Sequence, residues 1–191
     1  MKGSGQIRII GGQWKRTPIT VLDREGLRPT PDRVRETLFN WLGQRVDEWR
    51  CLDLFAGSGA LGFEAASRGA AEVTMVESNP QAARSIAAMV DKLSAQGQIR
   101  LVQASALDWL ARLSTTAAPF DLIFLDPPFG QNWLDQVMPR IASHLTPGGL
   151  VYVESDTEVS QDWAAQFGFH LIRADKAGMV HYHLLQLQDA D

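Results

Sequence analysis

The chain has 191 residues, 45% of them hydrophobic and 21% charged, which is typical of one globular domain with a short appendage. Its single cysteine, Cys51, excludes an internal disulfide and argues against a cysteine-based metal cluster, so we expect a reducing compartment and no metal. No secretion signal is recognisable, and no run approaches the roughly 18 apolar residues of a membrane helix. We therefore expect a cytoplasmic, monomeric protein without a membrane span.

Charge is distributed unevenly along the chain. Residues 1–50 contain 10 Lys and Arg against 6 Asp and Glu, whereas residues 51–191 contain 8 against 16, so the two parts carry +4 and −8. A basic arm ahead of an acidic body is typical of a protein whose N-terminal part meets a polyanion. An ordinary solvated surface is the simpler explanation of the same counts.

The first part of the sequence predicts an extension of the main domain. Three isoleucines precede Gly11-Gly12 and a Trp-Lys-Arg turn, which indicates a small β-hairpin or an extended arm. Thr30-Pro31 follows as a predicted N-cap and first-turn proline, and apolar residues recur at helical spacing within residues 34–42. We therefore divide the chain into a basic arm with a helix at 1–45 and a main domain at 46–191.

The main domain alternates between strand-like and helix-like segments. Strands are predicted at 51–54, 72–77, 99–103, 120–126 and 149–155. Helices are predicted near 58–68, 80–94, 106–113 and 131–145, and Pro147-Gly148-Gly149 marks the junction before the fifth strand. Two further runs, 169–175 and 179–186, predict a terminal antiparallel hairpin. This order predicts an α/β, Rossmann-like fold with a mostly parallel sheet covered by helices.

A glycine-rich turn follows the first strand of the main domain. Gly57, Gly59 and Gly62 match the pattern Gly-x-Gly-x-x-Gly between a strand and a helix, where backbone approaches a ligand closely. A dinucleotide would use the same turn, and Glu77 at the end of the next strand suits the ribose hydroxyls of either ligand. Asp53 favours S-adenosylmethionine, because a carboxylate ahead of the turn repels a pyrophosphate but attracts a cationic amino-acid end.

The residues that we expect to contact S-adenosylmethionine follow the ends of neighbouring strands. They are Asp53, Phe55, Ala56, Gly57, Ser58, Gly59, Glu77, Ser78, Asn79, Ser105, Ala106 and Asp126. Taken singly, Asp53 could be a turn cap and Glu77 a surface charge. Both readings weaken because the two carboxylates flank one glycine loop.

Asp126, Pro127, Pro128 and Phe129 end the apolar fourth strand and are the predicted catalytic residues. An amine conjugated to a nucleic-acid base is a poor nucleophile, because its lone pair is delocalised into the ring. If Asp126 and the Pro127 carbonyl accept its two N–H groups, the lone pair turns toward a methyl donor, and Phe129 can stack on the base. Adenine, cytosine, guanine and a glutamine amide would all fit, so the acceptor stays open here.

A family resemblance lies in both motifs, in G-G-Q-W-K and G-L-R-P-T-P-D-R-V-R-E-T-L-F-N-W-L near the start, and in K-A-G-M-V-H-Y near the end. The sequence resembles the RsmD family. These are bacterial small-subunit ribosomal RNA guanine-N2 methyltransferases, and the resemblance spans nearly the whole chain. It implies a seven-stranded class I methyltransferase fold and S-adenosylmethionine as donor. It also implies methylation of guanine 966 in 16S rRNA, within the small ribosomal subunit or an assembly intermediate.

The resemblance implies that basic residues of the arm and its helix contact the RNA. The candidates are Arg8, Lys15, Arg16, Arg28, Arg33 and Arg35. Two alternatives remain at this stage. A DNA adenine or cytosine amino-methyltransferase would share both motifs, although the chain has little room for a separate target-recognition domain. A non-catalytic ribosome assembly factor would share the fold, although the intact Asp126 turn argues for catalysis.

Overall fold

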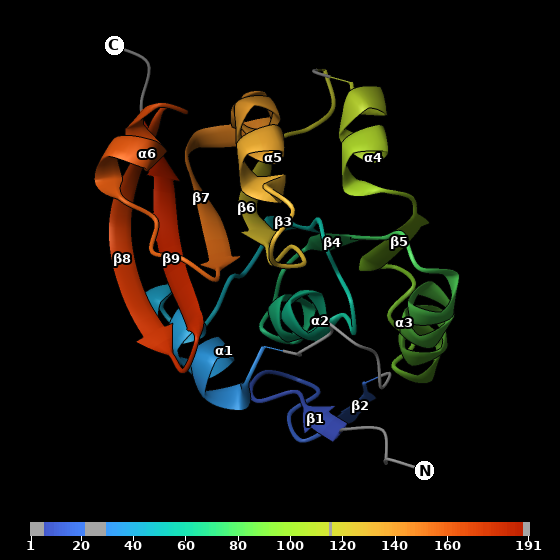
Figure 1. Ribbon diagram of the computed structural model, residues 1–191. Coiled ribbons are helices and arrows are strands. Elements are labelled where there is room, and N and C mark those ends of the chain that lie inside the picture. Colours follow the sequence, from blue (N-terminus) through green and yellow to red (C-terminus); the bar gives the residue numbers. More distant parts are fainter. Residues whose placement is uncertain (1–5, 22–29, 115, 189–191) are drawn as a thin grey trace.

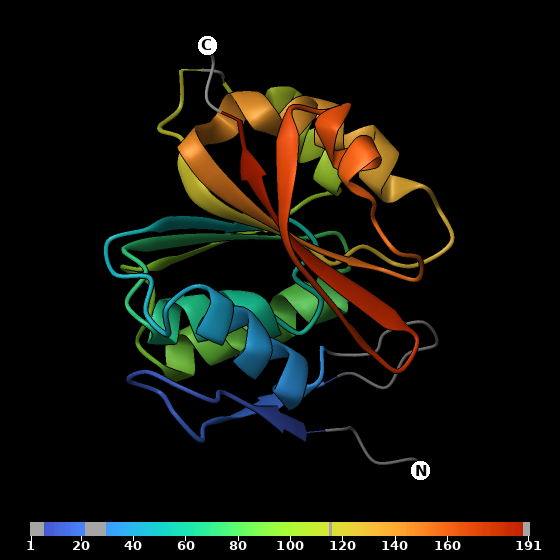
Figure 2. The same cartoon turned by 90° about the vertical axis from the view of Figure 1, so that its left-hand side faces the viewer.

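The computed structural model describes residues 6–21, 30–114 and 116–188. Its centre is a seven-stranded sheet in the order β5-β4-β3-β6-β7-β9-β8 (Figure 1). Helices cover both faces, with α1, α2 and α3 on one side and α4, α5 and α6 on the other (Figure 2). The predicted α/β class, the mostly parallel sheet and the terminal antiparallel hairpin are confirmed.

The five parallel strands correspond to the five strands predicted for the main domain. They are β3 (Arg50–Asp53), β4 (Glu72–Glu77), β5 (Ile99–Gln103), β6 (Phe120–Leu125) and β7 (Leu145–Ser155). The hairpin consists of β8 (Phe169–Ala177) and β9 (Val180–Leu187), and β9 pairs antiparallel with β7. One predicted boundary is wrong, because Pro147-Gly148-Gly149 lies inside β7, where a register shift against β6 absorbs the irregular residues.

Three of the helices begin at residues whose side chains accept from free backbone N–H groups. The main-domain helices are α2 (Ala60–Ser67), α3 (Pro80–Lys92), α4 (Ala106–Arg112), α5 (Trp133–Ile141) and α6 (Gln161–Ala165), with a 3-10 turn at Ala142–His144. Asn79, Ser105 and Ser160 cap α3, α4 and α6 with their side chains. The sequence prediction missed α6, since five residues are too few to show helical periodicity. None of the helices in the described ranges has the length and apolar character of a membrane span.

Alternate strand residues enter two apolar clusters on opposite faces of the sheet. In β3, Cys51 packs into the cluster beneath α1, α2 and α3, whereas Leu52 packs into the cluster beneath α4, α5 and α6. Both side chains are fully buried, and complete burial of a side chain such as leucine contributes about 1.5–3 kcal/mol. Two buried faces hold β3 and β6 rigidly at the centre of the sheet.

The N-terminal extension packs onto the body through the same core. The hairpin strands β1 (Gln6–Arg8) and β2 (Pro18–Thr20) pair antiparallel, and helix α1 (Asp32–Trp41) follows. Ile9 and Ile19 are buried in the cluster that also contains Phe124 of β6. The hairpin and the amphipathic helix agree with the sequence prediction, while the division at 1–45 and 46–191 stays a prediction about roles.

Thr30 does not cap α1 as predicted. The helix begins at Asp32, Pro31 occupies the cap position, and no side chain bonds the free N–H groups there. The Thr30 hydroxyl instead contacts the carboxyl groups of Asp126 and Glu154, at 3.2 and 2.7 Å. Thr30 therefore bonds to distant residues, although its local sequence pattern indicates the start of a helix.

Candidate active site

The predicted site residues meet where the strand order reverses. From β3 the chain continues to β4 on one side, while β6 lies on the other, and ligands bind at such a reversal in open α/β sheets. Asp53 is paired in register with Phe124, two residues before Asp126. The two carboxylates therefore lie at the same carboxyl edge of the sheet.

Asp53 is a buried carboxylate that lacks a full set of partners. Its Oδ2 accepts a hydrogen bond from the Gly62 N–H at 3.0 Å, whereas Oδ1 is buried with no hydrogen-bond partner among the described residues. Burial raises the pKa of Asp53 to about 7; the Gly62 N–H opposes this shift, and the charges of Glu77 and Glu154 add to it. A buried polar atom without a partner calls for an explanation, and a cationic ligand group would supply one.

The glycine turn has a backbone path that few other residues could follow. Gly57 and Gly59 have φ of +56° and +78°, in the left-handed region. A Cβ at Gly62 would lie 2.5 Å from the Met75 Cε and 3.2 Å from the Asp53 Oδ2. The turn is therefore packed tightly between β3, β4 and the start of α2.

Glu77 ties the glycine turn to the end of β4. One carboxylate oxygen accepts from the Gly57 N–H and the other from the Asn79 N–H, both at 2.7 Å. Each carboxylate oxygen can accept a further hydrogen bond, so Glu77 keeps the capacity to bind ribose hydroxyls. Its orientation is fixed by the backbone of both loops.

The other predicted donor contacts surround this edge, and two of their side chains have structural partners. The Asn79 Oδ1 accepts from the N–H groups of Gln81 and Ala82 at 3.0 Å, and the Ser105 Oγ accepts from the Asp108 N–H at 3.2 Å. Phe55 packs edge-on against Trp133, with ring centroids 5.6 Å apart. These features fit a ligand with three parts. The Asp53 oxygen beside the glycine turn suits a cationic end, Glu77 suits a ribose, and the Phe55 ring suits an aromatic base.

The Asp126 turn forms one wall of a cavity of about 540 Å³ at the same edge of the sheet. Residues 127–135 and 154–160 line it together with Trp163. Pro127 is buried, whereas Pro128 is exposed and the Phe129 side chain is 44% exposed. An exposed aromatic ring beside a cavity is available to stack on a planar base.

Half-buried Asp126 forms a carboxyl pair with buried Glu154 that the sequence prediction missed. The Thr30 hydroxyl contacts both Asp126 and Glu154, and the Tyr152 hydroxyl donates to the Glu154 Oε1 at 2.9 Å. Burial raises the pKa of Asp126, and the nearby charges of Glu154 and Asp53 raise it further. Burial likewise raises the pKa of Glu154, against the hydrogen bonds from Thr30 and Tyr152. One signal was present in the sequence, since Glu154 lies near the end of the strand that follows the Asp126 turn, much as Glu77 ends β4.

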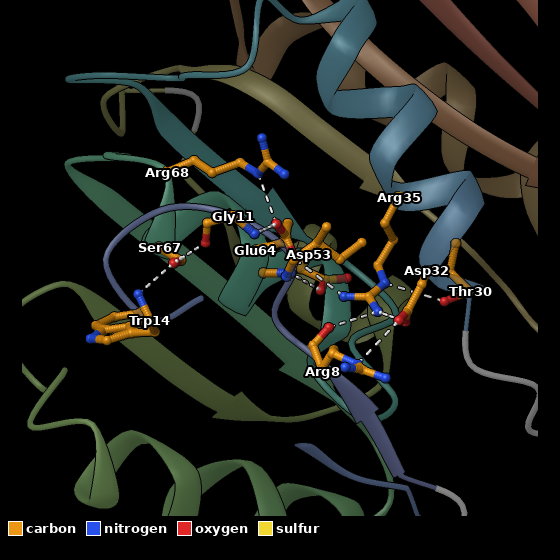
Figure 3. Close-up of polar contacts among 12 residues, drawn as sticks. Arg8, Gly11, Trp14, Thr30, Asp32, Arg35, Asp53, Glu64, Ser67 and Arg68 are labelled. Carbon is orange, nitrogen blue, oxygen red and sulfur yellow. Dashed lines mark hydrogen bonds and ion pairs between the residues drawn. The ribbon is translucent and has the colours of Figure 1, made fainter. Parts of the chain in front are cut away.

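Arg35 is a correction to the predicted RNA contacts. Its side chain is fully buried, and it bonds to the Glu64 carboxylate at 3.2 Å and to the Asp32 carboxylate at 2.5 Å. Figure 3 shows Glu64 between Arg35 and Arg68, beneath the chain at Gly11. Arg35 therefore attaches the arm to the body and has no surface to offer to RNA.

The remaining arm residues have different positions. Arg8, Lys15, Arg16 and Arg33 are exposed, so they stay available for the predicted RNA contact. Arg28 lies outside the described residues. Within the described ranges, no group of three or more His, Cys, Asp or Glu side chains is placed to hold a metal ion.

Sequence comparison identifies close relatives along nearly the whole chain. A family model described as "Conserved hypothetical protein 95" matches residues 7–186. Ribosomal RNA small subunit methyltransferase D of Escherichia coli strain K12 is 43% identical over 191 residues, which cover 96% of this chain and 91% of the relative. The protein of the same name from Haemophilus influenzae is 40% identical over 185 residues, covering 95% and 94%.

Comparison with solved structures agrees with the sequence matches. The Escherichia coli yhhF protein has a TM-score of 0.84 and 41% identity, covering 97% of this chain and 100% of that one. The methyltransferase-like protein SMU.776, solved in complex with SAH, has a TM-score of 0.71 at 14% identity, covering 89% and 53%, and so shares the fold. The match over residues 7–186 and these relatives show that the chain belongs to the RsmD family, the family of ribosomal RNA small subunit methyltransferase D.

Proposed function

We propose that this protein transfers a methyl group from S-adenosylmethionine to the N2 amine of guanine 966 in 16S rRNA, within the small ribosomal subunit or an assembly intermediate. Its relatives of 40% identity or more are named ribosomal RNA small subunit methyltransferases, and a structural neighbour is solved with SAH. The protein is thus an S-adenosylmethionine-dependent rRNA methyltransferase. The guanine and its N2 position are the proposal.

The observation that carries the proposal is the meeting of two different carboxyl sites at one sheet edge. Asp53, with its unpartnered Oδ1, lies beside the glycine turn, and Asp126 follows the adjacent strand. A cationic donor and an acceptor amine can therefore be held next to each other. Holding two reactants in position accounts for a large share of catalysis in such a displacement.

The donor site follows from the contacts of the strand ends. S-adenosylmethionine, when bound, supplies a methyl group carried on a positively charged sulfur. Asp53 would hold its amino group, and Glu77 would accept hydrogen bonds from its ribose hydroxyls. Phe55 and the turn at Ser105 offer the surroundings for its adenine ring.

The acceptor site uses the Asp126 turn. Asp126 and the Pro127 carbonyl accept the two N–H groups of the base amine, so the lone pair of the nitrogen is directed away from the ring system. Phe129, exposed beside the cavity, stacks on the base plane. A carboxylate with a raised pKa is also a better proton acceptor, so Asp126 can take a proton as the amine nitrogen becomes positively charged.

Small subunits from cells that lack the modification test the proposal directly. The purified protein is incubated with labelled S-adenosylmethionine and either these particles, the protein-free 16S rRNA or duplex DNA. We expect one methyl group per RNA, found on N2 of guanine 966 by nuclease digestion and mass spectrometry. Label on adenine or cytosine, or label in DNA, would contradict the proposal. Particle binding without any transfer would support a non-catalytic assembly factor instead.

A further inference from the structure

Glu154 lies next to Asp126 and lines the cavity beside the Asp126 turn. Val153 of β7 is paired in register with Leu125 of β6, so the two following residues, Glu154 and Asp126, lie side by side at the carboxyl edge of the sheet. The Glu154 residue is only 3% exposed, yet it lines the cavity beside the Asp126 turn. The acceptor site therefore contains a second carboxyl group that the methyl-transfer chemistry described above does not use.

The hydrogen bonds of Glu154 occupy one of its two oxygens. Thr30 donates to Oε1 at 2.7 Å and Tyr152 donates to the same Oε1 at 2.9 Å. No residue in the described ranges donates to Oε2. Because Glu154 lines the cavity and each carboxylate oxygen can accept hydrogen bonds, Oε2 is suited to accept one from a ligand there.

Thr30 holds the two carboxyl groups in a common orientation. Its hydroxyl is within 3.2 Å of the Asp126 Oδ2 as well as 2.7 Å from the Glu154 Oε1. Thr30 itself is buried and lies two residues before α1, so the N-terminal extension contributes a buried residue to the acceptor site. A loss of this hydroxyl would free both side chains to reorient.

Two adjacent acceptors match one base edge better than the others. Guanine carries a protonated ring nitrogen, N1–H, next to its N2 amine, so this edge offers neighbouring donors. Adenine and cytosine carry an unprotonated ring nitrogen next to their amines, which a carboxylate would repel. A second carboxylate beside Asp126 therefore selects guanine by attraction and disfavours the other two bases by repulsion.

We propose that the Glu154 Oε2 accepts a hydrogen bond from the N1–H of the target guanine, and that Thr30 and Tyr152 are positioning residues for Glu154. The proposal rests on the proposed guanine-N2 function and adds the residue that distinguishes guanine from other bases. It assigns base selectivity to Glu154 of β7 and to Thr30, two residues before α1, whereas the Asp126 turn holds the amine.

A base analogue isolates the N1 contact. In 16S rRNA assembled by ligation, 2-aminopurine replaces the target guanine; it keeps the amine, has an unprotonated N1 and lacks O6. Loss of a hydrogen bond to a charged group should lower kcat/KM of the wild-type enzyme on this RNA by about 10- to 100-fold.

For Glu154→Gln we expect lower activity on guanine. The ratio of kcat/KM on guanine to kcat/KM on 2-aminopurine should fall about tenfold or more relative to wild type, because the amide can donate to an unprotonated N1. The analogue lacks O6 for the wild-type enzyme and for Glu154→Gln alike, so the effect of O6 cancels when the two are compared. The difference between their preferences therefore reports the contact with N1.

Matched variants separate selectivity from folding. Glu72→Gln removes a carboxylate at the opposite end of the sheet, where Glu72 pairs with Arg50, and should leave the guanine preference unchanged. Thr30→Val should reduce the preference for guanine over 2-aminopurine, as Glu154→Gln does. Thr30→Ser keeps the hydroxyl and should retain the wild-type preference. Affinity for S-adenosylhomocysteine, measured by calorimetry, should stay within about threefold of wild type in all four variants if each is folded.

The outcomes distinguish the two proposals. If the wild-type enzyme does not methylate guanine N2, the proposed function fails. If it does, and folded Glu154→Gln and Thr30→Val keep the wild-type preference for guanine over 2-aminopurine, Glu154 does not read N1 and the inference is overturned. If Glu154→Gln does not fold, the Thr30→Val and Thr30→Ser pair decides the question.

Discussion

Asp53 and Asp126 show how two identical side chains acquire different roles at one sheet edge. Asp53 is buried and Asp126 is half-buried, and the loss of contact with water raises the pKa of each. Asp53 faces the glycine turn and is bonded by the Gly62 N–H, whereas Asp126 is bonded by Thr30 and begins the proline turn. Asp53 suits the positively charged amino group of the donor, and Asp126 suits an amine that loses a proton during the reaction.

Replacing Asp126 by alanine should separate catalysis from donor binding. We expect Asp126→Ala to lower the single-turnover rate by at least about 10²- to 10³-fold, the cost of removing one preorganised charge-stabilising group. Affinity for S-adenosylhomocysteine should stay within about tenfold of wild type, because Asp126 is assigned to the base. A comparable loss of donor affinity, measured by calorimetry, would contradict this division of labour.

Donor affinity should depend on pH through Asp53. Because its pKa in the free protein is about 7, the carboxyl is increasingly protonated below that pH and loses its attraction for a cationic amino group. The dissociation constant of S-adenosylmethionine should therefore rise toward about tenfold per pH unit well below pH 7 and level off above about pH 8. Asp53→Asn should bind weakly at every pH, without this dependence. A wild-type affinity that is constant from about pH 5.5 to 8 would exclude the assignment.

The same raised pKa affects folding with the opposite trend. In the unfolded chain an Asp titrates near its ordinary value of 3.8, whereas in the folded protein Asp53 holds its proton up to about 7. Its contribution to stability is complete below the unfolded pKa and is lost as pH rises through the folded pKa. The free energy of unfolding of Asp53→Asn, measured by urea denaturation, should therefore fall less between about pH 5 and 7 than that of the wild type.

At the scale of elements, the N-terminal extension is attached to α2 by a buried network of charges and backbone groups. Glu64, with no exposed surface, accepts from the backbone N–H groups of Ile10 and Gly11 and pairs with Arg35 and Arg68. A Cβ at Gly12 would come within 1.8 Å of the Ser67 carbonyl oxygen, so the arm crosses the end of α2 in close contact. Helix α2 begins at the glycine turn, which links the arm to the donor site.

Breaking this network should destabilise the whole fold. Arg35→Met leaves the Glu64 charge buried with one fewer partner, and we expect the free energy of unfolding to fall by about 3–5 kcal/mol. Arg45→Met removes the same type of side chain from the exposed pair with Asp47 and should leave the unfolding transition nearly unchanged. Urea denaturation of both variants tests the contrast. Equal effects of the two substitutions would show that the buried pair does not secure the arm.

At the scale of the whole molecule, charge separates into two regions. The first 50 residues carry +4 and the remainder carries −8. The exposed basic side chains in the described part of the extension are Arg8, Lys15, Arg16, Arg33 and Arg45. The acidic remainder would repel RNA, so the extension offers the surface on which a polyanion is attracted rather than repelled.

Charge reversal in the extension should change the salt dependence of RNA binding. Lys15→Glu with Arg16→Glu should weaken binding to the 16S substrate and reduce the slope of log affinity against log salt by about 0.7–0.9 for each phosphate that the arm no longer neutralises. The reversal of Arg112 and Arg140, at the ends of α4 and α5 on the other face of the sheet, changes the net charge equally and should leave this slope unaltered. Filter binding over a salt series compares them. An unchanged slope in the first double variant would remove Lys15 and Arg16 from the RNA interface.

Local patterns in the sequence were sufficient for most of the fold. The predicted limits of β4 and β5 agree with the structure, because each strand is an apolar run between clear turn residues. The glycine turn and the Asp126 turn were also recognisable, since positive φ angles favour glycine and two prolines end a strand. The arm sequence indicated the family, which the matched relatives confirm.

The tertiary structure alone decided which polar residues are buried together. Thr30 has the pattern of a helix cap and Arg35 that of a surface charge, yet Thr30 bonds to Asp126 and Glu154, 96 and 124 residues away, and Arg35 is buried against Glu64. A side chain's burial and its partners depend on how distant segments pack, and no local pattern carries that information. By itself the sequence determined the elements and the two motifs, because these depend on neighbouring residues; the second carboxyl group and the attachment of the arm depend on contacts that exist only in the folded chain.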